Sequence, residues 1–364
     1  MTDPERAAAA DGRAARGAAR VYLDWNASAP LRPEARAAML AALEQAGNPS
    51  SVHAEGRAAR AIVERARAEG GAGTGCAPER VFFTSGATEA AAMALAGRGL
   101  SSAAIEHDCV LAWTDPVLPV APDGSVAVAD PASSVLQAAN SETGVVQDLP
   151  PGLACVDAAQ AIGRIPFAFD WSGARMALVS AHKLGGPKGV GALLLAEGAD
   201  PAPWLRGGGQ EQGRRAGTEN VAGLAGFGAA AAAAVADLAA GVWEPVAKLR
   251  EVLESGLEAA AGQTIFVGKA RPRLPNTSCV AVPGWRGETQ VMQMDLAGFA
   301  VSAGSACSSG RARPSRVLAA MGHSPEVAGA AIRVSLGPDT TEDEVARFIA
   351  TWTRHETRFR RRAA

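Results

Sequence analysis

Short apolar runs that alternate with helical segments constrain the fold of this chain more than any other feature. The predicted helices are Pro33–Glu44, Gly56–Glu69 and the Ala-rich stretch that ends at Leu95. The apolar runs are Val21–Asp24, Val81–Thr84, Ala103–Ile105, Val126–Val128, Val135–Ala139, Leu153–Val156, Met176–Ser180 and Val190–Leu195. Elements in this order predict an α/β fold with a largely parallel sheet, whose ligands bind at the carboxyl ends of the strands.

The pattern changes in the last third of the chain. From Leu224 to Ala261 it is helical and Ala-rich, and a final helix begins at Glu342. The segments Ser278–Val282, Gln290–Leu296 and Ile332–Ser335 complete a small α+β unit. We therefore expect a disordered tail over residues 1–20, a large domain over 21–245 and a small C-terminal domain over 246–364.

The composition favours a soluble globular enzyme. Hydrophobic residues make up 48% of the 364 residues and charged residues 20%, which is enough for a large core. The formal net charge of −2 gives no electrostatic basis for binding nucleic acid or an anionic membrane. Gly, Pro or a charged residue interrupts each apolar run before it reaches the roughly 20 residues of a membrane span. Asp3, Glu5 and Asp11 argue against an N-terminal transit peptide.

The cysteines are widely spaced and include no C-x-x-C pair, so they predict neither a disulfide framework nor a metal site. They indicate a reducing compartment, and we expect a cytoplasmic protein. We expect all of them except Cys307 to be inert. The five are Cys76, Cys109, Cys155, Cys279 and Cys307.

Two separate motifs carry the reactive groups. Only Lys183, among the few lysines, follows an apolar strand-like run, in the sequence Ser180-Ala181-His182-Lys183. A lysine amine can hold an aldehyde cofactor as a Schiff base. Cys307 lies in a run of small residues that suits a mobile loop, where a thiol can attack what such a cofactor activates. The pair predicts pyridoxal-phosphate chemistry that ends in sulfur transfer.

Other residues support this prediction, although each has an ordinary structural alternative. Gly86, Ala87 and Thr88 lie where a strand meets a helix, so they either bind a phosphate or merely begin the helix. Asp157 ends an apolar run, where it either keeps a pyridine nitrogen protonated or caps a turn. His107 follows another run and either stacks on the cofactor ring or is an unremarkable histidine.

Two further segments fit the same site. The glycines at 207–209 and Thr218 offer flexible backbone and a hydroxyl for a phosphate, or they form a plain surface loop. Arg333 is a charge inside an apolar strand, where it either clamps a substrate carboxylate or faces solvent.

The order of these motifs resembles that of the cysteine desulfurases, within the class V aminotransferase-like enzymes. The likeness runs from about Val21 to Trp352 and favours the iron–sulfur-assembly type, which has a long cysteine loop. The matching motifs are Tyr22–Asp24, Gly47–Ser51 with His53, Thr84–Glu89, Glu106-His107, Glu142–Gln147, Asp157–Gln160, Ser180–Lys183, Gly207–Glu211, Ala216–Thr218, Gly304–Cys307 and Arg333–Gly337.

The resemblance implies a pyridoxal 5'-phosphate-dependent transferase of the aspartate-aminotransferase-like fold (fold type I). It also implies a homodimer that converts L-cysteine to L-alanine and passes sulfur to an acceptor such as an iron–sulfur scaffold protein. No metal, nucleic acid or membrane is implied.

The same resemblance implies roles for individual residues. Lys183 carries the cofactor and moves the substrate α-proton, and Cys307 receives the sulfur as a persulfide. His107 stacks on the cofactor ring, relays protons and is the candidate base for Cys307. Arg333 binds the substrate carboxylate. The remaining cofactor contacts are Asp157 at the pyridine nitrogen, Gln160 at the ring oxygen, and Ala87, Thr88, Ser180, His182 and the second subunit's copy of Thr218 at the phosphate.

The sequence departs from the family pattern in two places. The family has two asparagines before the Glu-x-Gly, and this chain has Asn140-Ser141. The second asparagine contacts the ring oxygen and the substrate, so either Ser141 reaches through its hydroxyl or Asn140 shifts. The segment between His107 and Asn140 is also shorter than is typical. We expect activity with weaker substrate binding.

Two other functions remain open at this point. One is a different enzyme of the same fold, such as a selenocysteine lyase or an aminotransferase, although aminotransfer needs no thiol. The other is a catalytically weak scaffold that binds assembly partners, against which the joint presence of Lys183, Asp157 and Cys307 argues.

Overall fold

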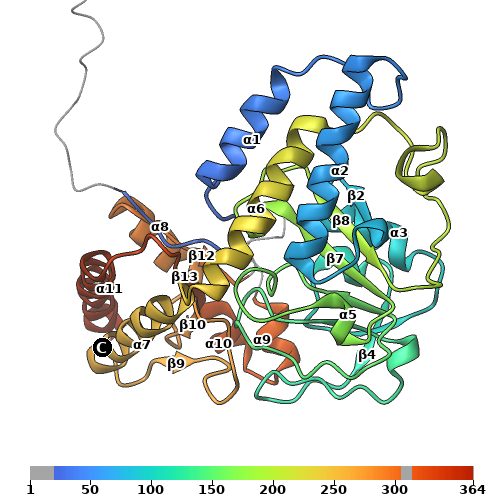
Figure 1. Cartoon of the computed structure of the whole chain (residues 1–364). Helices are drawn as coiled ribbons and strands as arrows, with labels where there is room; N and C mark the ends of the chain where they lie inside the picture. Colours follow the sequence, from blue (N-terminus) through green and yellow to red (C-terminus); the bar gives the residue numbers. More distant parts are fainter. Residues whose placement is uncertain (1–19, 305–313, 364) are drawn as a thin grey trace, which may run out of the picture.

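The computed structural model describes residues 20–304 and 314–363 of the chain. The predicted tail up to residue 19 and the predicted nucleophile Cys307 lie outside these ranges. A large unit with a central sheet and a smaller unit built from the C-terminal third lie side by side (Figure 1).

The central sheet has the strand order β2-β8-β7-β6-β5. Strands β5, β6 and β7 run parallel, whereas β8 is antiparallel to both β7 and β2. The link between β7 and β8, residues 181–190, is shorter than the dozen or more residues of a parallel crossover. The α/β class is therefore confirmed, but the sheet is mixed at this edge. The strands are β2 (Val81–Thr84), β5 (Val135–Gln137), β6 (Cys155–Asp157), β7 (Met176–Ser180) and β8 (Gly191–Leu195).

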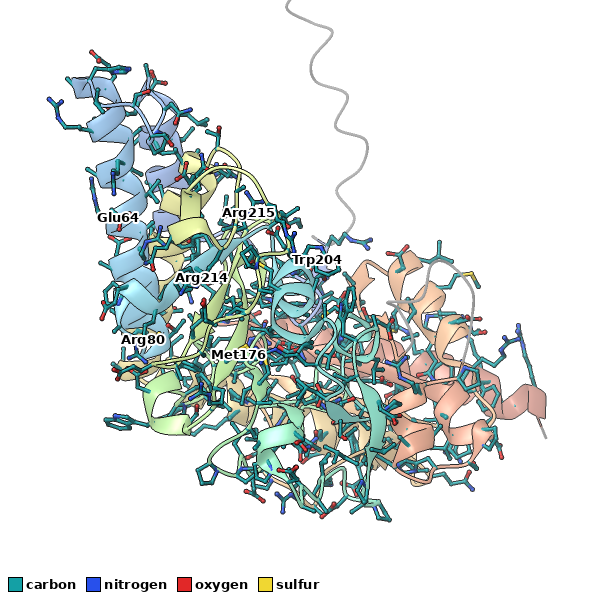
Figure 2. The ribbon with its side chains drawn as sticks, turned by 90° about the vertical axis from the view of Figure 1, so that its right-hand side faces the viewer. Glu64, Arg80, Met176, Trp204, Arg214 and Arg215 are labelled. Atoms are coloured by element: carbon teal, nitrogen blue, oxygen red, sulfur yellow. The ribbon has the colours of Figure 1, made fainter. Side chains whose placement is uncertain are left out.

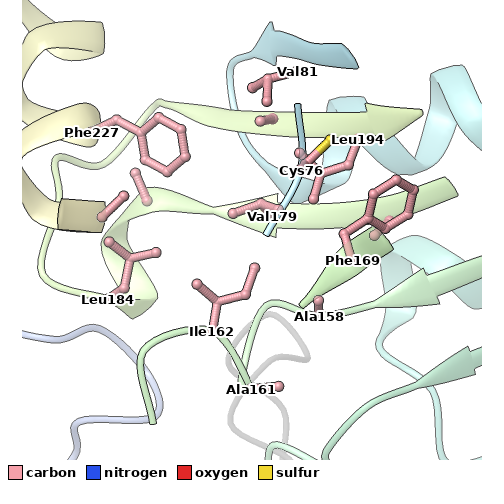
Figure 3. Packing of buried hydrophobic residues seen from close by; sticks show 14 of the residues in the cluster. Cys76, Val81, Ala158, Ala161, Ile162, Phe169, Val179, Leu184, Leu194 and Phe227 are labelled. Atoms are coloured by element: carbon pink, nitrogen blue, oxygen red, sulfur yellow. The ribbon is translucent and has the colours of Figure 1, made fainter. Parts of the chain in front are cut away.

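Helices cover both faces of this sheet, so its strands are buried throughout. On one face, α1 (Pro33–Leu43), α2 (Ala54–Thr74) and α6 (Val221–Ala239) pack together (Figure 1). Phe227 of α6 shares a core cluster with Val179 of β7 and Leu194 of β8 (Figure 3). On the other face, α3 (Ala87–Leu95) packs against β7 and β8.

One expectation about membranes needs correction. Helix α6 is long and apolar enough to span a membrane by length and composition, and it is the one such helix among the described residues. Half of its apolar window is buried inside the protein, where it packs against α1 and α2. Its apolar composition is therefore explained by its place in the core.

The smaller unit contains an antiparallel sheet of order β12-β13-β10-β9. Helices α7, α8 and α11 contribute to its core. Strand β1 also joins this unit, because it pairs with β11 and its Val21 belongs to the same core cluster as Trp352. Strand β1 is therefore part of the smaller unit and not of the large domain to which we assigned it. The elements are β1 (Val21–Tyr22), α7 (Trp243–Ala260), β9 (Ile265–Phe266), β10 (Thr277–Ala281), α8 (Gly287–Leu296), β11 (Phe299–Ala300), β12 (Ser302–Ala303), β13 (Ala331–Ser335) and α11 (Glu342–Ala363).

Short elements complete the described chain, and two of the sequence expectations differ from them. The run Val126–Val128 forms no strand, because Val126 makes only an isolated bridge to Val120. Helix α2 extends past the predicted Glu69, to the left-handed Gly75 at its end. The short elements are η3 (Pro78–Arg80), β3 (Ser101–Ala103), α4 (Asp108–Leu111), β4 (Asp115–Leu118), η4 (Pro131–Ser133), α5 (Phe169–Ser172), η5 (Ala181–Lys183), η6 (Gln210–Gly213), α9 (Arg316–Ala320) and α10 (Pro325–Ala330).

Candidate active site

A cavity of about 500 Å³ lies at the carboxyl ends of β6 and β7, and the smaller unit contributes residues to its wall. Most of the predicted site residues line it. They are Ala87, Thr88, His107, Ser141, Asp157, Gln160, Ser180, His182, Lys183 and Arg333. The sequence analysis did not select several others, among them Asn26, Ser28, Cys109, Gln137, Lys188 and Ser302.

Lys183 stands at the end of η5, directly after β7. Its Nζ atom donates to the main-chain oxygens of Asn26, at 2.7 Å, and of Ala27, at 3.0 Å. These carbonyls hold the amine at the cavity wall. The position is the one that the strand pattern predicted for the cofactor-binding lysine.

Asp157 is the last residue of β6 and is buried at the cavity. One carboxylate oxygen accepts a hydrogen bond of 2.9 Å from the Ala159 amide. Burial raises the pKa of the Asp157 carboxyl, and the Ala159 amide, His107 and Lys183 oppose this rise. A buried carboxylate of this kind favours a protonated nitrogen as its partner, which suits the pyridine nitrogen of pyridoxal phosphate.

A second carboxyl group lies behind Asp157. Glu106 is buried, and burial together with the charge of Asp157 raises its pKa well above the ordinary value. Its Oε1 atom accepts from the Gln137 amide at 2.8 Å, while Oε2 has no partner among the described residues. The raised pKa of Glu106 favours its neutral form, which reduces the repulsion between this carboxyl group and the carboxylate of Asp157.

Another part of the cavity wall, at the start of α3, has features that suit a phosphate. Gly86 has φ 152°, and apart from its two neighbours in the chain no described residue has an atom within 4 Å of where its Cβ would stand. Helix α3 follows, so the amides of its first turn lack intrahelical partners. Burial, and next the charge of Lys183, lower the pKa of His182 to about 4, so its imidazole is neutral at pH 7. The open backbone at Gly86 and the hydroxyls of Thr88 and Ser180 therefore fit the phosphate of the cofactor.

Arg333 enters the cavity from the middle of β13 and is almost fully buried. Its Nη1 atom donates to the Ser141 oxygen at 3.0 Å, and its Nη2 atom donates to Asp24 Oδ1 at 2.7 Å. The Ser302 hydroxyl donates to the second oxygen of Asp24 at 2.8 Å. Arg333 Nε has no partner among the described residues. The two terminal nitrogens of the guanidinium are thus fixed by Ser141 and Asp24, and Arg333 faces the cavity rather than solvent.

The sequence analysis missed Asn26, which connects the parts of this site. Its main-chain oxygen accepts a hydrogen bond from Lys183 Nζ and another, at 3.0 Å, from the side-chain amide of Gln160. Its side chain donates to the Ser141 oxygen at 3.1 Å and accepts from Arg164 at 3.0 Å. The only local signal was its position two residues after Asp24, which does not reveal contacts with residues more than a hundred positions away.

Two predicted residues lie outside this cavity in the single chain, and of these Asn140 differs from the expectation, since Thr218 was expected to act in the site of the partner subunit. Asn140 does not line the cavity, because its side chain binds the amides of Glu142 and Thr143 and the oxygen of Ile105. It shapes the turn that presents Ser141 to the cavity. Thr218 is exposed and lines a separate hollow of about 100 Å³.

Comparison with known proteins gives one consistent result. The family described as aminotransferase class-V matches residues 21–113 and 130–348, and the unmatched stretch lies between His107 and Asn140. The chain is 41% identical to a cysteine desulfurase of Frankia sp. (strain EuIK1), covering 89% of this chain and 88% of the relative. It is 40% identical to a cysteine desulfurase of Cereibacter sphaeroides, covering 91% and 94%.

A third relative and two solved structures agree. The cysteine desulfurase IscS of Dictyoglomus turgidum is 34% identical, with 89% of this chain and 91% of the relative covered. A NifS-like protein superposes with a TM-score of 0.83 at 31% identity, covering 93% and 99% of the two chains. The NifS-like protein of Rickettsia africae superposes with a TM-score of 0.83 at 28% identity, covering 92% and 99%.

Proposed function

Because this chain belongs to the class-V aminotransferase family and to its cysteine desulfurases, we propose that it takes sulfur from L-cysteine, releases L-alanine and holds the sulfur on Cys307. The protein is a pyridoxal 5'-phosphate-dependent transferase. One observation supports the roles that we propose for individual residues. Lys183, Asp157 and Arg333 come from distant parts of the chain and line one cavity.

The cavity fits the cofactor at each end. Asp157 and Gln160 would hold the ring, His107 would lie against it, and Lys183 would bind the aldehyde carbon. Ala87, Thr88, Ser180 and His182 would hold the phosphate, together with Thr218 of the partner subunit. Bound there, pyridoxal phosphate supplies an electron sink that weakens the bonds at the α- and β-carbons of an amino acid.

We assign substrate binding and proton transfer to residues of the chain itself. The Arg333 guanidinium binds the carboxylate of L-cysteine, which fixes the direction of the substrate. Ser141 lies beside it, where its hydroxyl reaches the substrate region. Lys183 Nζ takes the α-proton and returns a proton to carbon, since an amine at the site of chemistry acts as a general base and then as an acid.

Cys307, which lies outside the described residues, supplies the nucleophile. Its thiolate attacks the sulfur of the substrate, so that an S–S bond forms and the C–S bond breaks. The electron pair of that bond stays with the carbon fragment, which takes up protons and leaves as alanine. The sulfur remains on Cys307 as a persulfide.

The test is the release of alanine and sulfide from L-cysteine in the presence of a thiol reductant. We expect equal amounts of both products from the wild type, and neither from Cys307→Ala, which still shows the yellow absorbance of the cofactor. Cys76→Ala is the matched control, because this buried thiol is remote from the cavity and burial raises its pKa to about 12. Products that persist in Cys307→Ala would favour a lyase, and a product other than alanine would favour an aminotransferase.

The partners and the location are further parts of this proposal. We expect a homodimer in which each Thr218 reaches the partner's phosphate site, because this residue is exposed in the single chain. We also expect sulfur transfer to an iron–sulfur scaffold protein, since a relative that matches 89% of this chain is named cysteine desulfurase IscS. A cytoplasmic location is supported by the free, buried thiols of Cys76, Cys109, Cys155 and Cys279.

A further inference from the structure

His107 begins helix α4 as its N-cap residue, and this position fixes one of its ring nitrogens. The Cys109 amide donates to His107 Nδ1 at a distance of 3.1 Å. The Cys109 sulfur lies 3.0 Å from the same nitrogen. A main-chain N–H can only donate, so the amide contact requires Nδ1 to be an acceptor, and the thiol S–H can donate to the same nitrogen.

An imidazole nitrogen that accepts a hydrogen bond carries no proton. A neutral imidazole holds one proton in total, so that proton is on Nε2. A second proton at Nδ1 would point at the Cys109 N–H and break the cap of α4. The local structure therefore favours the neutral imidazole with its proton on Nε2.

Some charged groups around His107 favour a protonated imidazole, and others oppose it. Asp157 on β6 favours a charged imidazole, whereas Lys183 on η5 and the first turn of α4 oppose it. Burial raises the pKa of the Glu106 carboxyl, which weakens the negative charge that it presents to His107. Asp108 on α4 is already paired with Arg316 at 2.7 Å. The direct contacts at Nδ1 decide among these opposing effects, because they act at hydrogen-bond distance.

We propose that His107 is a fixed hydrogen-bond donor through Nε2–H in the cavity, and not the base that deprotonates Cys307. This inference rests on the proposed function, in which His107 faces the cofactor and the substrate. A donor at this point stabilises an oxygen or sulfur that gains negative charge. The thiol proton of Cys307 then leaves to another base or to water.

Three variants of the holoenzyme separate a donor from a base. His107→Gln places an amide N–H near the position of Nε2, His107→Asn places an acceptor near that of Nδ1, and His107→Ala keeps neither. A donor predicts that His107→Gln retains kcat within about tenfold of wild type, while His107→Asn and His107→Ala fall about a hundredfold or more. A base predicts equal losses in all three, together with loss of the acidic limb of the pH profile. That result would overturn the proposal.

A second readout does not depend on turnover. The chain has five histidines, and in the 15N-histidine-labelled holoenzyme the signals missing from His107→Gln belong to His107. We expect an unprotonated Nδ1 and a protonated Nε2 throughout the range of about pH 6 to 9. A proton on Nδ1 in this range would refute the inference. If the wild type releases no alanine from L-cysteine, the proposed function fails, yet the same spectra still determine the tautomer.

Discussion

Arg333 and Asp24 form an ion pair across 309 residues of sequence, with Nη2 and Oδ1 2.7 Å apart. Both side chains are largely buried at the cavity, and Ser302 holds the second oxygen of Asp24. The guanidinium proposed to bind the substrate is therefore oriented before any substrate arrives. A guanidinium group that is already oriented loses less conformational entropy when it binds a carboxylate than a mobile guanidinium group does.

Replacing Asp24 tests this orientation. We expect Asp24→Asn to raise KM for L-cysteine about tenfold, or roughly 1.4 kcal/mol of binding, with a smaller change in kcat. Steady-state kinetics checks this, and Ser302→Ala, which removes only the supporting hydroxyl, should have a weaker effect in the same direction. A lower KM in Asp24→Asn would mean instead that Asp24 competes with the substrate for Arg333.

Ser141 offers a gain-of-function test. It lines the cavity where the family has an asparagine, and its main-chain oxygen already accepts from Asn26 and Arg333. We expect Ser141→Asn to lower KM for L-cysteine about three- to tenfold, since one added hydrogen bond contributes about 1 kcal/mol. Unchanged KM and kcat would show that the serine does not impair the site.

The buried carboxyl group of Glu142 should make the free energy of unfolding depend on pH. Its buried carboxyl contacts Gly304 and Ser315, and burial raises its pKa to about 7 against the opposing effects of Ser315, Arg333 and Arg316. Between the ordinary value of 4.5 and about 7, the folded protein keeps a proton that the unfolded chain has lost. This group therefore lowers the free energy of unfolding as pH rises through that window, by on the order of 3 kcal/mol.

Glu142→Gln removes the titration while keeping the shape of the side chain. We expect the stability of the variant relative to wild type to increase from pH 5 to pH 8 by on the order of 3 kcal/mol. Urea denaturation of the holoenzyme at both pH values measures it. Glu288→Gln, at a half-exposed carboxyl on α8, serves as control and should show little change. A constant difference between Glu142→Gln and wild type would contradict the raised pKa.

Glu211 holds the segment that carries Thr218. Its two carboxylate oxygens bind Nη1 and Nη2 of Arg67, each at 2.8 Å, and one also accepts from the Phe83 amide. Glu211 itself has φ 48°, an uncommon conformation that these contacts stabilise. Farther along the same segment, Arg215, which is labelled in Figure 2, forms an ion pair with Glu89 of α3.

We expect Glu211→Gln to lower the free energy of unfolding by about 3 kcal/mol, because it leaves the buried guanidinium of Arg67 with the exposed Glu64 as its remaining charged partner. Thermal or urea unfolding measures this loss. The matched control is Glu258→Gln, whose partner Lys269 is exposed, and it should cost no more than about 1 kcal/mol. Equal losses in the two variants would show that burial adds nothing to the Arg67 pair.

The sequence predicted the residues at the strand ends well. Asp157 ends β6, Ser180 ends β7 and Lys183 follows it, and all three line the cavity. Parallel strands bring their carboxyl ends to one edge, so position along the chain is enough to place such residues. The antiparallel direction of β8 was not apparent, since an apolar strand reads the same in either direction.

Other parts of the site depend on contacts between distant segments. Local sequence determined the α/β class, the position of Lys183 after β7 and the strand that carries Arg333, because dihedral preferences and hydrophobic periodicity are properties of neighbouring residues. Only the tertiary structure placed Asp24 against Arg333, gave Asn26 its central position and put Asn140 behind Ser141. These are hydrogen bonds of buried polar groups, and their partners are decided by how the two units pack rather than by spacing along the chain.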